Sequence, residues 1–283
     1  MAATPHARAS FLDWFGRLLR PGLMVSWALA ACARMVCAQA GSLAQAPPSL
    51  TDLRVRFDHD VTHRVAVPLD EQIAYMTQLD DELIAAGQGL SVHQFVILVD
   101  RSTKVQIVAL LWGKISSWVW LGASRASTGM VGRFEHFETP LGVFEHSLAN
   151  PDFRAEGTYN KWHIRGYGRQ GMRVYDLGWV RTEKGWGHGG EGQMRLQMHA
   201  TDPDWLEPLL GRAASKGCIR IAASLNDFID RYGLLDEDYF LAEKRGQLLW
   251  VLRPDRQATL WPGRYVVVVD SMRQSRPDWL RLP

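Results

Sequence analysis

The chain has 283 residues, of which 47% are hydrophobic and 22% are charged, and its formal net charge is +2. A chain of this length and composition can bury enough apolar surface for one well-packed domain with a small accessory segment, which excludes an intrinsically disordered protein. Because 32 basic residues are balanced by 30 acidic ones without a dense basic block, the charge gives no basis for nucleic-acid binding.

The first forty residues are typical of an export signal. Three arginines precede or adjoin the apolar stretch 23–31, and small-residue cleavage sites follow at Ala38-Gln39-Ala40 and Ala44-Gln45-Ala46. Arg34 interrupts the apolar stretch, which is also shorter than the about 20 residues that span a membrane, so a permanent anchor is disfavoured. We therefore expect residues 1–40 to be a signal peptide and the mature protein to be exported.

The same region also allows a lipoprotein signal. Leu29-Ala30-Ala31-Cys32 resembles a bacterial lipobox, and in that case the signal ends before Cys32 and a lipid on this residue gives the membrane association. In either case Cys32 and Cys37 belong to the leader, and cleavage after Ala40 leaves Cys218 alone. A disulfide framework is therefore excluded for the mature chain.

Residues 41–92 are expected to form a linker and one helix that braces the main domain. Pro47 and Pro48 mark the linker, and Gly87 is placed to end the helix. After Pro68, apolar residues recur at helical spacing at Ile73, Met76, Leu79, Leu83 and Ile84.

From His93 onward the pattern changes to strands. One helix interrupts them: Ser224 to Asp227 resembles a capping box, and Gly233 is placed to end this helix. Frequent strands with few long helices predict a mainly β fold, either a β-sandwich or a barrel-like sheet. The expected strands are 95–99, 105–112, 118–121, 142–145, 173–180, 193–199, 248–252 and 265–269.

Strand alternation predicts where two reactive side chains point. In the strand 193–199 the apolar side chains share one face, so His199 lies on the polar face and is expected to point away from the core. The same alternation puts Cys218 and Arg220 on the polar side of the next strand. If the two strands are neighbours, joined by the loop 200–216, thiol and imidazole meet at a cleft.

A thiol beside an imidazole favours acyl transfer. A free thiol with a pKa of about 8.5 is mostly protonated at neutral pH, and an adjacent imidazolium lowers that pKa. Cys218 would then rest as the thiolate nucleophile, while His199 protonates the leaving amine and deprotonates the acceptor. Gly217 permits a positive φ, so the N–H groups of Gly217 and Cys218 could be aimed at the oxyanion of a tetrahedral intermediate.

Each of these features has a structural alternative. A lone cysteine or histidine is more often structural than catalytic, Gly217 could merely shape a turn, and Arg220 could form a surface ion pair instead of binding a carboxylate. Glu135, His136 and Glu138 with Glu145 and His146 match no metal-ligand spacing, so we interpret them as solvated strand ends. Core packing is the expected role of most of the twelve tryptophans, and the segment from Trp179-Val180 through Trp186-Gly187-His188-Gly189-Gly190 is expected to form a glycine-rich loop near the cleft.

Two motifs resemble those of a known family, the L,D-transpeptidases of the YkuD type. His199 followed by Ser215-Lys216-Gly217-Cys218-Ile219-Arg220 resembles the family signature, a histidine and then Ser-x-Gly-Cys-x-Arg. Ser127-Thr128-Gly129 followed by Thr139-Pro140-Leu141-Gly142-Val143-Phe144 resembles its STG and TPxGxF segment. Two motifs in the expected order are more specific than either one, and the resemblance covers about residues 93–254.

The resemblance implies a YkuD-like β-sandwich with a few short helices and an N-terminal helical brace. Residues 93–254 would be the catalytic domain. Residues 255–283 lie outside the resemblance and are expected to form a C-terminal β extension or tail. Family members cross-link peptidoglycan: the cysteine attacks the bond between the third residue of a tetrapeptide stem and its terminal D-alanine, and the thioester passes to an amine on another stem. Peptidoglycan stems are thus the implied partners, and the periplasm or cell envelope is the implied location of the exported protein. Carbapenem β-lactams are implied inhibitors, and no metal or organic cofactor is implied.

The resemblance also implies roles for individual residues. Cys218 would be the nucleophile, His199 the general acid and base, and the Ala200 carbonyl would orient the imidazole. The Gly217 and Cys218 amides would form the oxyanion hole. Ser215 and Arg220 would support the loop or bind substrate carboxylates.

Two positions depart from the family pattern. Lys216 replaces the histidine that is common between Ser and Gly, and Ala200 stands where glycine is frequent. Lys216 adds positive charge that could favour a thiolate or attract an acidic stem. The acceptor is therefore left open: an L,D-carboxypeptidase or amidase would use water, and a non-catalytic peptidoglycan-binding protein would retain only the fold.

Overall fold

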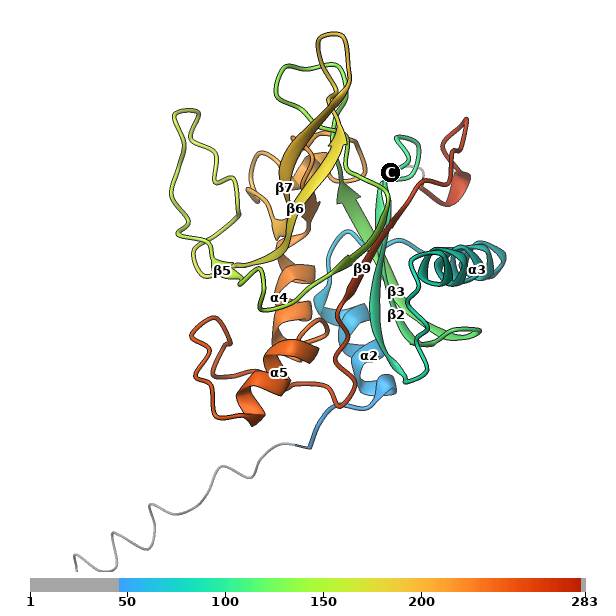
Figure 1. The fold of residues 1–283 in the computed structure, drawn as a ribbon, viewed down its shortest axis with the longest axis vertical. Coiled ribbons are helices and arrows are strands. Elements are labelled where there is room, and N and C mark those ends of the chain that lie inside the picture. The colour runs from blue at the N-terminus through green and yellow to red at the C-terminus, as the bar shows by residue number, and fades with distance from the viewer. Residues whose placement is uncertain (1–45, 281–283) are drawn as a thin grey trace, which may run out of the picture. The chain divides into compact units, whose positions relative to one another are not determined.

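A nine-stranded mixed sheet dominates the computed structural model, which describes residues 46–280 (Figure 1). The strand order is β4-β9-β1-β2-β3-β8-β7-β6-β5. The strands are β1 Gln94–Asp100, β2 Ile107–Lys114, β3 Ser117–Ser127, β4 Gly142–Glu145, β5 Phe153–Arg154, β6 Arg173–Glu183, β7 Glu191–Ala200, β8 Ile219–Ile221 and β9 Tyr265–Val269. The predicted signal peptide, the lipobox and both leader cysteines lie outside the described residues.

The sheet is continuous because one long strand belongs to both of its halves. β3 pairs with β2 along most of its length and with β8 through Ala126 and Ser127. Neighbouring strands are mostly antiparallel, but β1 and β9 are parallel, and so are β7 and β8. The prediction of a mainly β fold with few short helices is confirmed, and the sheet curls on itself through β3.

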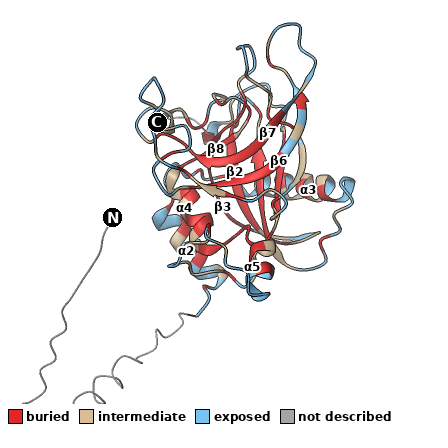
Figure 2. Cartoon of the chain, turned by 60° about the vertical axis from the view of Figure 1, so that its left-hand side comes forward, coloured by how far each residue is buried: buried red, intermediate tan, exposed pale blue. Residues whose placement is uncertain are grey.

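Both faces of the central strands are covered. In β1 the side chains of Phe95 and Ile97 enter one apolar core, and those of Val96 and Leu98 enter another on the opposite face. The helices α2 (Leu50–Asp60) and α4 (Ala223–Tyr232) contribute to the first core, and α3 (Leu69–Ala85) contributes to the second (Figures 1 and 2). Burial on both sides explains why β1 is an uninterrupted apolar run, and each large side chain buried this way contributes about 1.5–3 kcal/mol.

The helix predicted after Pro68 is α3, and Gly87 follows it with a φ of 71°. The face it buries differs from the predicted one. Ile73 and Ile84 are 55% and 59% exposed, whereas Tyr75, Leu79 and Leu83 are buried against the sheet. The buried stripe of α3 is therefore narrower than the stripe that the spacing of its apolar residues predicts.

The N-terminal segment contains two helices, so the prediction of one was wrong. Ser49 and Asp52 form a capping box at the start of α2, in which the Asp52 N–H donates to Ser49 Oγ over 3.1 Å. Only Leu53 and Phe57 of this helix are buried. Two apolar residues four apart give little periodicity, and the cap was the signal that could have found the helix.

Two details near the C-terminus also differ from expectation. Ser224 does not cap α4; its Oγ accepts a hydrogen bond of 2.8 Å from the Thr62 N–H, while Gly233 ends the helix at φ 59° as predicted. Residues 248–252 are a loop after α5 (Glu237–Lys244) and not a strand. Trp250 in this loop is 74% exposed.

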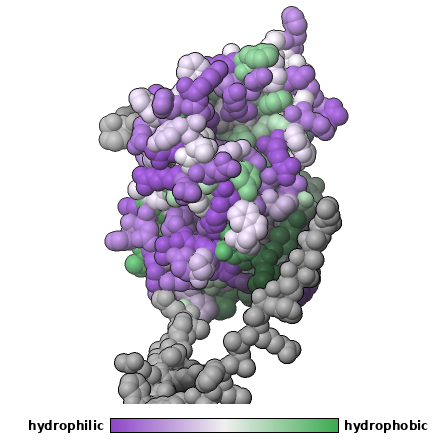
Figure 3. Space-filling model, turned by 90° about the vertical axis from the view of Figure 1, so that its left-hand side faces the viewer, coloured by the Kyte–Doolittle hydropathy of each residue, from purple (hydrophilic) through white to green (hydrophobic). Residues whose placement is uncertain are grey.

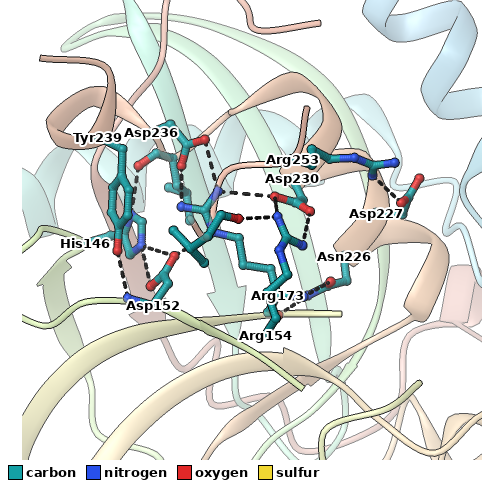
Figure 4. Close-up of polar contacts among 12 residues, drawn as sticks. His146, Asp152, Arg154, Arg173, Asn226, Asp227, Asp230, Asp236, Tyr239 and Arg253 are labelled. Atoms are coloured by element: carbon teal, nitrogen blue, oxygen red, sulfur yellow. Dashed lines mark hydrogen bonds and ion pairs between the residues drawn. The ribbon is translucent and has the colours of Figure 1, made fainter. Parts of the chain in front are cut away.

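A buried ionic network lies beside β5, β6 and α4 (Figure 4). His146 belongs to it and is fully buried, so its interpretation as a solvated strand end was wrong. Its Nδ1 lies 2.8 Å from the Leu235 carbonyl and its Nε2 lies 2.9 Å from Asp152. Since both partners are acceptors, both ring nitrogens must donate. Burial opposes the resulting charge, but the Asp152 carboxylate raises the pKa of His146.

Arg173 is the centre of this network. Its buried guanidinium contacts Asp152 at 2.7 Å, Asp230 at 3.3 Å and Asp236 at 2.7 Å. Arg154 pairs with Asp230 at 2.7 Å. The three carboxylates are thus matched by the two arginines and the His146 imidazolium, and the network ties together segments far apart in the chain.

Within the described residues, none of the helices combines the length and the apolar character that crossing a lipid bilayer requires.

Candidate active site

His199 is in β7, and Cys218 directly precedes β8. These two strands are neighbours, which was the condition for the thiol and the imidazole to lie on one face of the sheet. β7 and β8 are parallel, with Met198 opposite Ile219 and His199 opposite Arg220. Met198 and Ile219 face the core. Cys218 directly precedes β8, so alternation places it with His199 and Arg220 on the other face of the sheet.

That face is not open to solvent at His199, which is only 5% exposed. The chain between β5 and β6 folds over it: the Tyr167 ring meets the His199 ring edge-on, with centroids 4.7 Å apart. A Cβ on Gly168 would lie 3.0 Å from the Ala200 Cβ, so the loop packs closely here. His199 thus points away from the apolar core, as expected, but the loop between β5 and β6 covers it and excludes solvent.

The His199 imidazole is fixed in one orientation. Its Nδ1 lies 2.5 Å from the Ala200 carbonyl, which can only accept, so the proton sits on Nδ1 and Nε2 is left with its lone pair. Burial lowers the pKa of His199 to about 4, partly offset by the Ala200 carbonyl and reinforced by the Arg220 charge. The ring is therefore neutral at pH 7, with Nε2 able to accept a proton.

The Cys218 thiol is half-buried and also neutral. Its Sγ lies 3.6 Å from the Arg195 carbonyl, to which it donates, and no thiol–imidazole hydrogen bond is present among residues 46–280. Burial raises the pKa of Cys218, against the opposing effects of the Gln197 backbone N–H and the Arg220 guanidinium. The resting pair is thus thiol and imidazole, which differs from the expected thiolate and imidazolium.

This neutral pair predicts the pH dependence of Cys218 alkylation by iodoacetamide. Because the pKa of the thiol is raised, the alkylation rate should climb with pH through pH 9 and show no plateau between pH 6 and 8. Mass spectrometry of the tryptic peptide containing Cys218 measures the rate. A plateau at neutral pH would instead reveal a thiolate stabilised by a protonated His199.

Ser215 braces the turn that carries the thiol. This fully buried residue donates from Oγ to the Cys218 carbonyl over 2.6 Å and accepts from the Gly217 N–H over 3.0 Å. Of the two roles expected for Ser215, these contacts correspond to support of the loop. Because the Gly217 amide is occupied, the Cys218 N–H, which makes no hydrogen bond within the described part of the chain, is the amide left for an oxyanion.

Glycine is required at position 217 for two reasons. Its φ is +125°, and a Cβ there would lie 2.6 Å from Met194 Sδ. The φ is the stronger restriction, because the Met194 thioether is the end of a flexible side chain and can move aside, whereas side-chain-bearing residues rarely adopt this backbone conformation.

The two cations of the motif have different surroundings. Arg220 donates to the Ala214 carbonyl over 3.0 Å and lies close enough to affect the pKa values of both His199 and Cys218. Lys216 is exposed and lies 3.5 Å from Glu135. Lys216 is paired with this carboxylate and is not among the groups that shift the pKa of Cys218.

The second motif holds the thiol-bearing turn in place. Thr139 Oγ1 accepts from the Gly129 N–H over 2.9 Å and donates to the Gly217 carbonyl over 2.6 Å. A Cβ on Gly129 would lie 2.1 Å from the Phe137 carbonyl, so only glycine fits between these strands. The two motifs that resemble the family signature are therefore in direct contact.

Sequence reasoning missed two residues around the thiol. The Tyr167 hydroxyl donates to Gln197 Oε1 over 2.9 Å, and a charge on Cys218 would raise the pKa of Tyr167, which is already raised by burial. Asp176 Oδ2 accepts from Arg195 Nε at 2.7 Å and from Gln197 Nε2 at 3.1 Å. Alternation had placed Arg195 and Gln197 on this face, but nothing local in the sequence marks Tyr167 or Asp176 as their partners.

The Asp176 backbone connects this site to the buried network, because its N–H donates to Asp152 over 2.9 Å. In the described range, no three His, Cys, Asp or Glu side chains gather as a metal-binding group.

Comparisons with known proteins give distant matches only. No protein-family model and no curated protein matches the chain. Bd1075 of Bdellovibrio bacteriovorus is 12% identical with a TM-score of 0.32, and the match covers 64% of this chain and 50% of that one. A fused Zn-dependent amidase/peptidase/peptidoglycan-binding domain-containing protein of Clostridium acetobutylicum is 14% identical with a TM-score of 0.30, over 72% and 64% of the two chains.

The helical cell shape determining protein Pgp2 of Campylobacter jejuni is also 14% identical with a TM-score of 0.30, and the match covers 74% of this chain and 58% of that one. The chain thus spans between half and two-thirds of the length of these proteins. Solved structures similar to this chain therefore include proteins named for peptidoglycan or for cell shape, at a similarity too low to place the chain in a family.

Proposed function

We propose that this protein is an exported cysteine L,D-transpeptidase that cross-links peptidoglycan stem peptides in the cell envelope. One observation carries the proposal: β7, which bears His199, is the parallel neighbour of β8, which Cys218 directly precedes, and the turn bearing the thiol is clamped by Thr139 of the second motif. The resemblance of both motifs to the transpeptidase family supports the choice of substrate.

The neutral pair suits acylation by concerted proton transfer. Rotation about the Cα–Cβ bond of Cys218 first moves the thiol from the Arg195 carbonyl toward His199. Catalytic hydrogen bonds often form only when substrate is bound, so the resting contact does not oppose this step. As Sγ attacks the carbonyl carbon of the third stem residue, His199 Nε2 takes the thiol proton. The Cys218 N–H donates to the oxyanion.

Collapse of the tetrahedral intermediate breaks the amide bond and leaves a thioester. The departing D-alanine amine takes the proton from His199, which becomes neutral again. In the second half-reaction an acceptor amine attacks the thioester and loses a proton to His199, and the Cys218 sulfur leaves with that proton. The Ala200 carbonyl holds the ring in the required tautomer through both steps.

Intact-mass spectrometry tests this function. Wild-type protein incubated with a tetrapeptide donor should gain the mass of the tripeptide acyl group, and protein alkylated beforehand at Cys218 should not. A carbapenem should give the corresponding adduct. Absence of both adducts on folded wild-type protein would contradict the proposal.

Product analysis then identifies the acceptor. Cross-linked stem dimers are the expected products. Trimmed tripeptides alone would identify water as the acceptor and make the protein a carboxypeptidase.

A further inference from the structure

A cavity of about 630 Å³ opens on the far side of Tyr167 from His199. It lies between the β5–β6 loop and the loop after α5, which contributes Trp250. Its lining includes Glu156, Thr158, Tyr159, Asn160, Tyr167 and Trp250. The catalytic mechanism uses none of this lining except the ring of Tyr167 that covers His199.

The cavity has two exposed aromatic rings on anchored supports. Tyr159 is 54% exposed, and the Arg165 guanidinium lies 4.5 Å from its ring centroid and donates to its hydroxyl. Trp250 is 74% exposed, although its neighbour Val251 is buried and accepts a hydrogen bond from Arg154. Since large aromatic side chains are usually buried, two exposed rings that line one cavity indicate a binding surface.

Core packing was predicted for most tryptophans, and within residues 46–280 it holds for half of them. Trp120 is buried in the second core, and four more pack against one core or the other: Trp112, Trp118, Trp261 and Trp279. Trp162, Trp179, Trp205 and Trp250 are exposed. Trp250 differs from the other exposed tryptophans in that it borders two cavities.

The charges of these cavities disfavour an acidic ligand. Arg154 is the only cation in the lining of the larger cavity, and it is engaged by Asp230 at 2.7 and 3.2 Å and by the Gly171 carbonyl at 2.9 Å. The adjoining cavity of about 360 Å³ shares Arg154 and Trp250. Its other charged lining residues are Asp227, Asp230, Arg253 and Asp255, of which Arg253 is paired with Asp227 and Asp255.

The surface around the two cavities also disfavours binding of a large apolar partner. Figure 3, which looks at the side of the molecule that carries β5 and α5, shows a mostly hydrophilic surface, with one continuous green area at its lower right and smaller pale and green areas elsewhere. Aromatic rings among neutral polar groups, with paired cations and an excess of carboxylates, suit an uncharged, polyhydroxylated ligand.

We propose that the two cavities form one groove that binds the sugar rings of a glycan strand, with Tyr159 and Trp250 as stacking platforms. This inference rests on the proposed function, and it names the part of peptidoglycan that binds outside the reaction centre. The two cavities share Arg154 and Trp250 in their linings, so a linear polymer could pass from one into the other. A strand in the groove would run past Tyr167 and bring the stem peptide that it carries toward Cys218.

Binding of peptide-free sugars tests the groove separately from the chemistry. The probes are soluble oligomers of β-1,4-linked N-acetylglucosamine and glycan strands stripped of their stems, with the exposed lactyl carboxylates capped as neutral amides, titrated calorimetrically into the full-length protein. Wild type should bind both, and Trp250→Ala and Tyr159→Ala should each weaken binding at least tenfold. Trp162→Ala is the matched control, because Trp162 lies in the same loop and is 70% exposed but does not line the cavity.

The outcomes separate this inference from the proposed function. No binding of either sugar probe by wild type, or equal binding by wild type and Trp250→Ala, would overturn the glycan groove. A free stem peptide that displaces bound sugar from the groove would also overturn it, since the cavity would then be a peptide site. Failure of the proposed function would appear elsewhere, as the absence of a Cys218 adduct while sugar binding persists.

Discussion

Replacing Cys218 with alanine should lower turnover of a tetrapeptide donor by at least about 10⁴-fold and abolish the covalent adduct. The reaction proposed above forms a bond to this sulfur, and no other cysteine is present from residue 46 onward. Removing a nucleophile leaves only the contributions of substrate binding and oxyanion stabilisation, which are small by comparison. Muropeptide analysis by liquid chromatography and mass spectrometry measures the turnover.

The substitution should leave the fold intact, which makes the result interpretable. Cys218 is half-buried, and its turn is held by Ser215 and Thr139 through backbone atoms that alanine retains. Cys218→Ser is the shape-matched comparison and should also lose activity, because a hydroxyl is far harder to deprotonate than a thiol. Urea unfolding should give similar midpoints for all three proteins. Turnover by Cys218→Ala at more than a hundredth of the wild-type rate would show that another group performs the reaction.

The relative placement of Cys218 and His199 could be predicted because strand alternation is a local property. Two short segments with alternating apolar residues fix which face each side chain occupies, whatever lies above that face. What covers the face depends on residues distant in sequence. Tyr167 is more than thirty positions from His199, and no spacing rule connects them. The low pKa of His199, the raised pKa of Cys218 and the neutral resting pair all follow from this covering.

The elements that were missed or wrongly assigned share a weak local pattern. The helix α2 buries only Leu53 and Phe57, so a capping box was its main signal. Residues 248–252 have the composition of a strand, yet Leu248 is fully exposed and the Val251 carbonyl is held by Arg154 from β5. A tertiary contact thus decided the conformation. The same holds for His146, whose burial depends on Asp152 and on the distant Leu235 carbonyl.

Replacing Arg173 with methionine should destabilise the protein by about 3–5 kcal/mol, the usual cost of removing one partner from a buried ion pair. Methionine fills a similar volume, so the loss is mainly electrostatic. In wild type Arg173 contacts Asp152, Asp230 and Asp236, and its side chain has no exposed surface. Without it, the three buried carboxylates would retain only His146 and Arg154 as counter-charges.

A surface pair provides the matched control for this prediction. Arg181 lies 2.6 Å from Glu191 but its side chain is 73% exposed, so Arg181→Met should change stability by less than about 1 kcal/mol. Both free energies come from urea unfolding followed by far-ultraviolet circular dichroism. Equal stabilities of the two variants would mean that water reaches the network around Arg173. The expected large difference would show that this network stabilises the end of β6, from which Asp176 orients Arg195 and Gln197 beside Cys218.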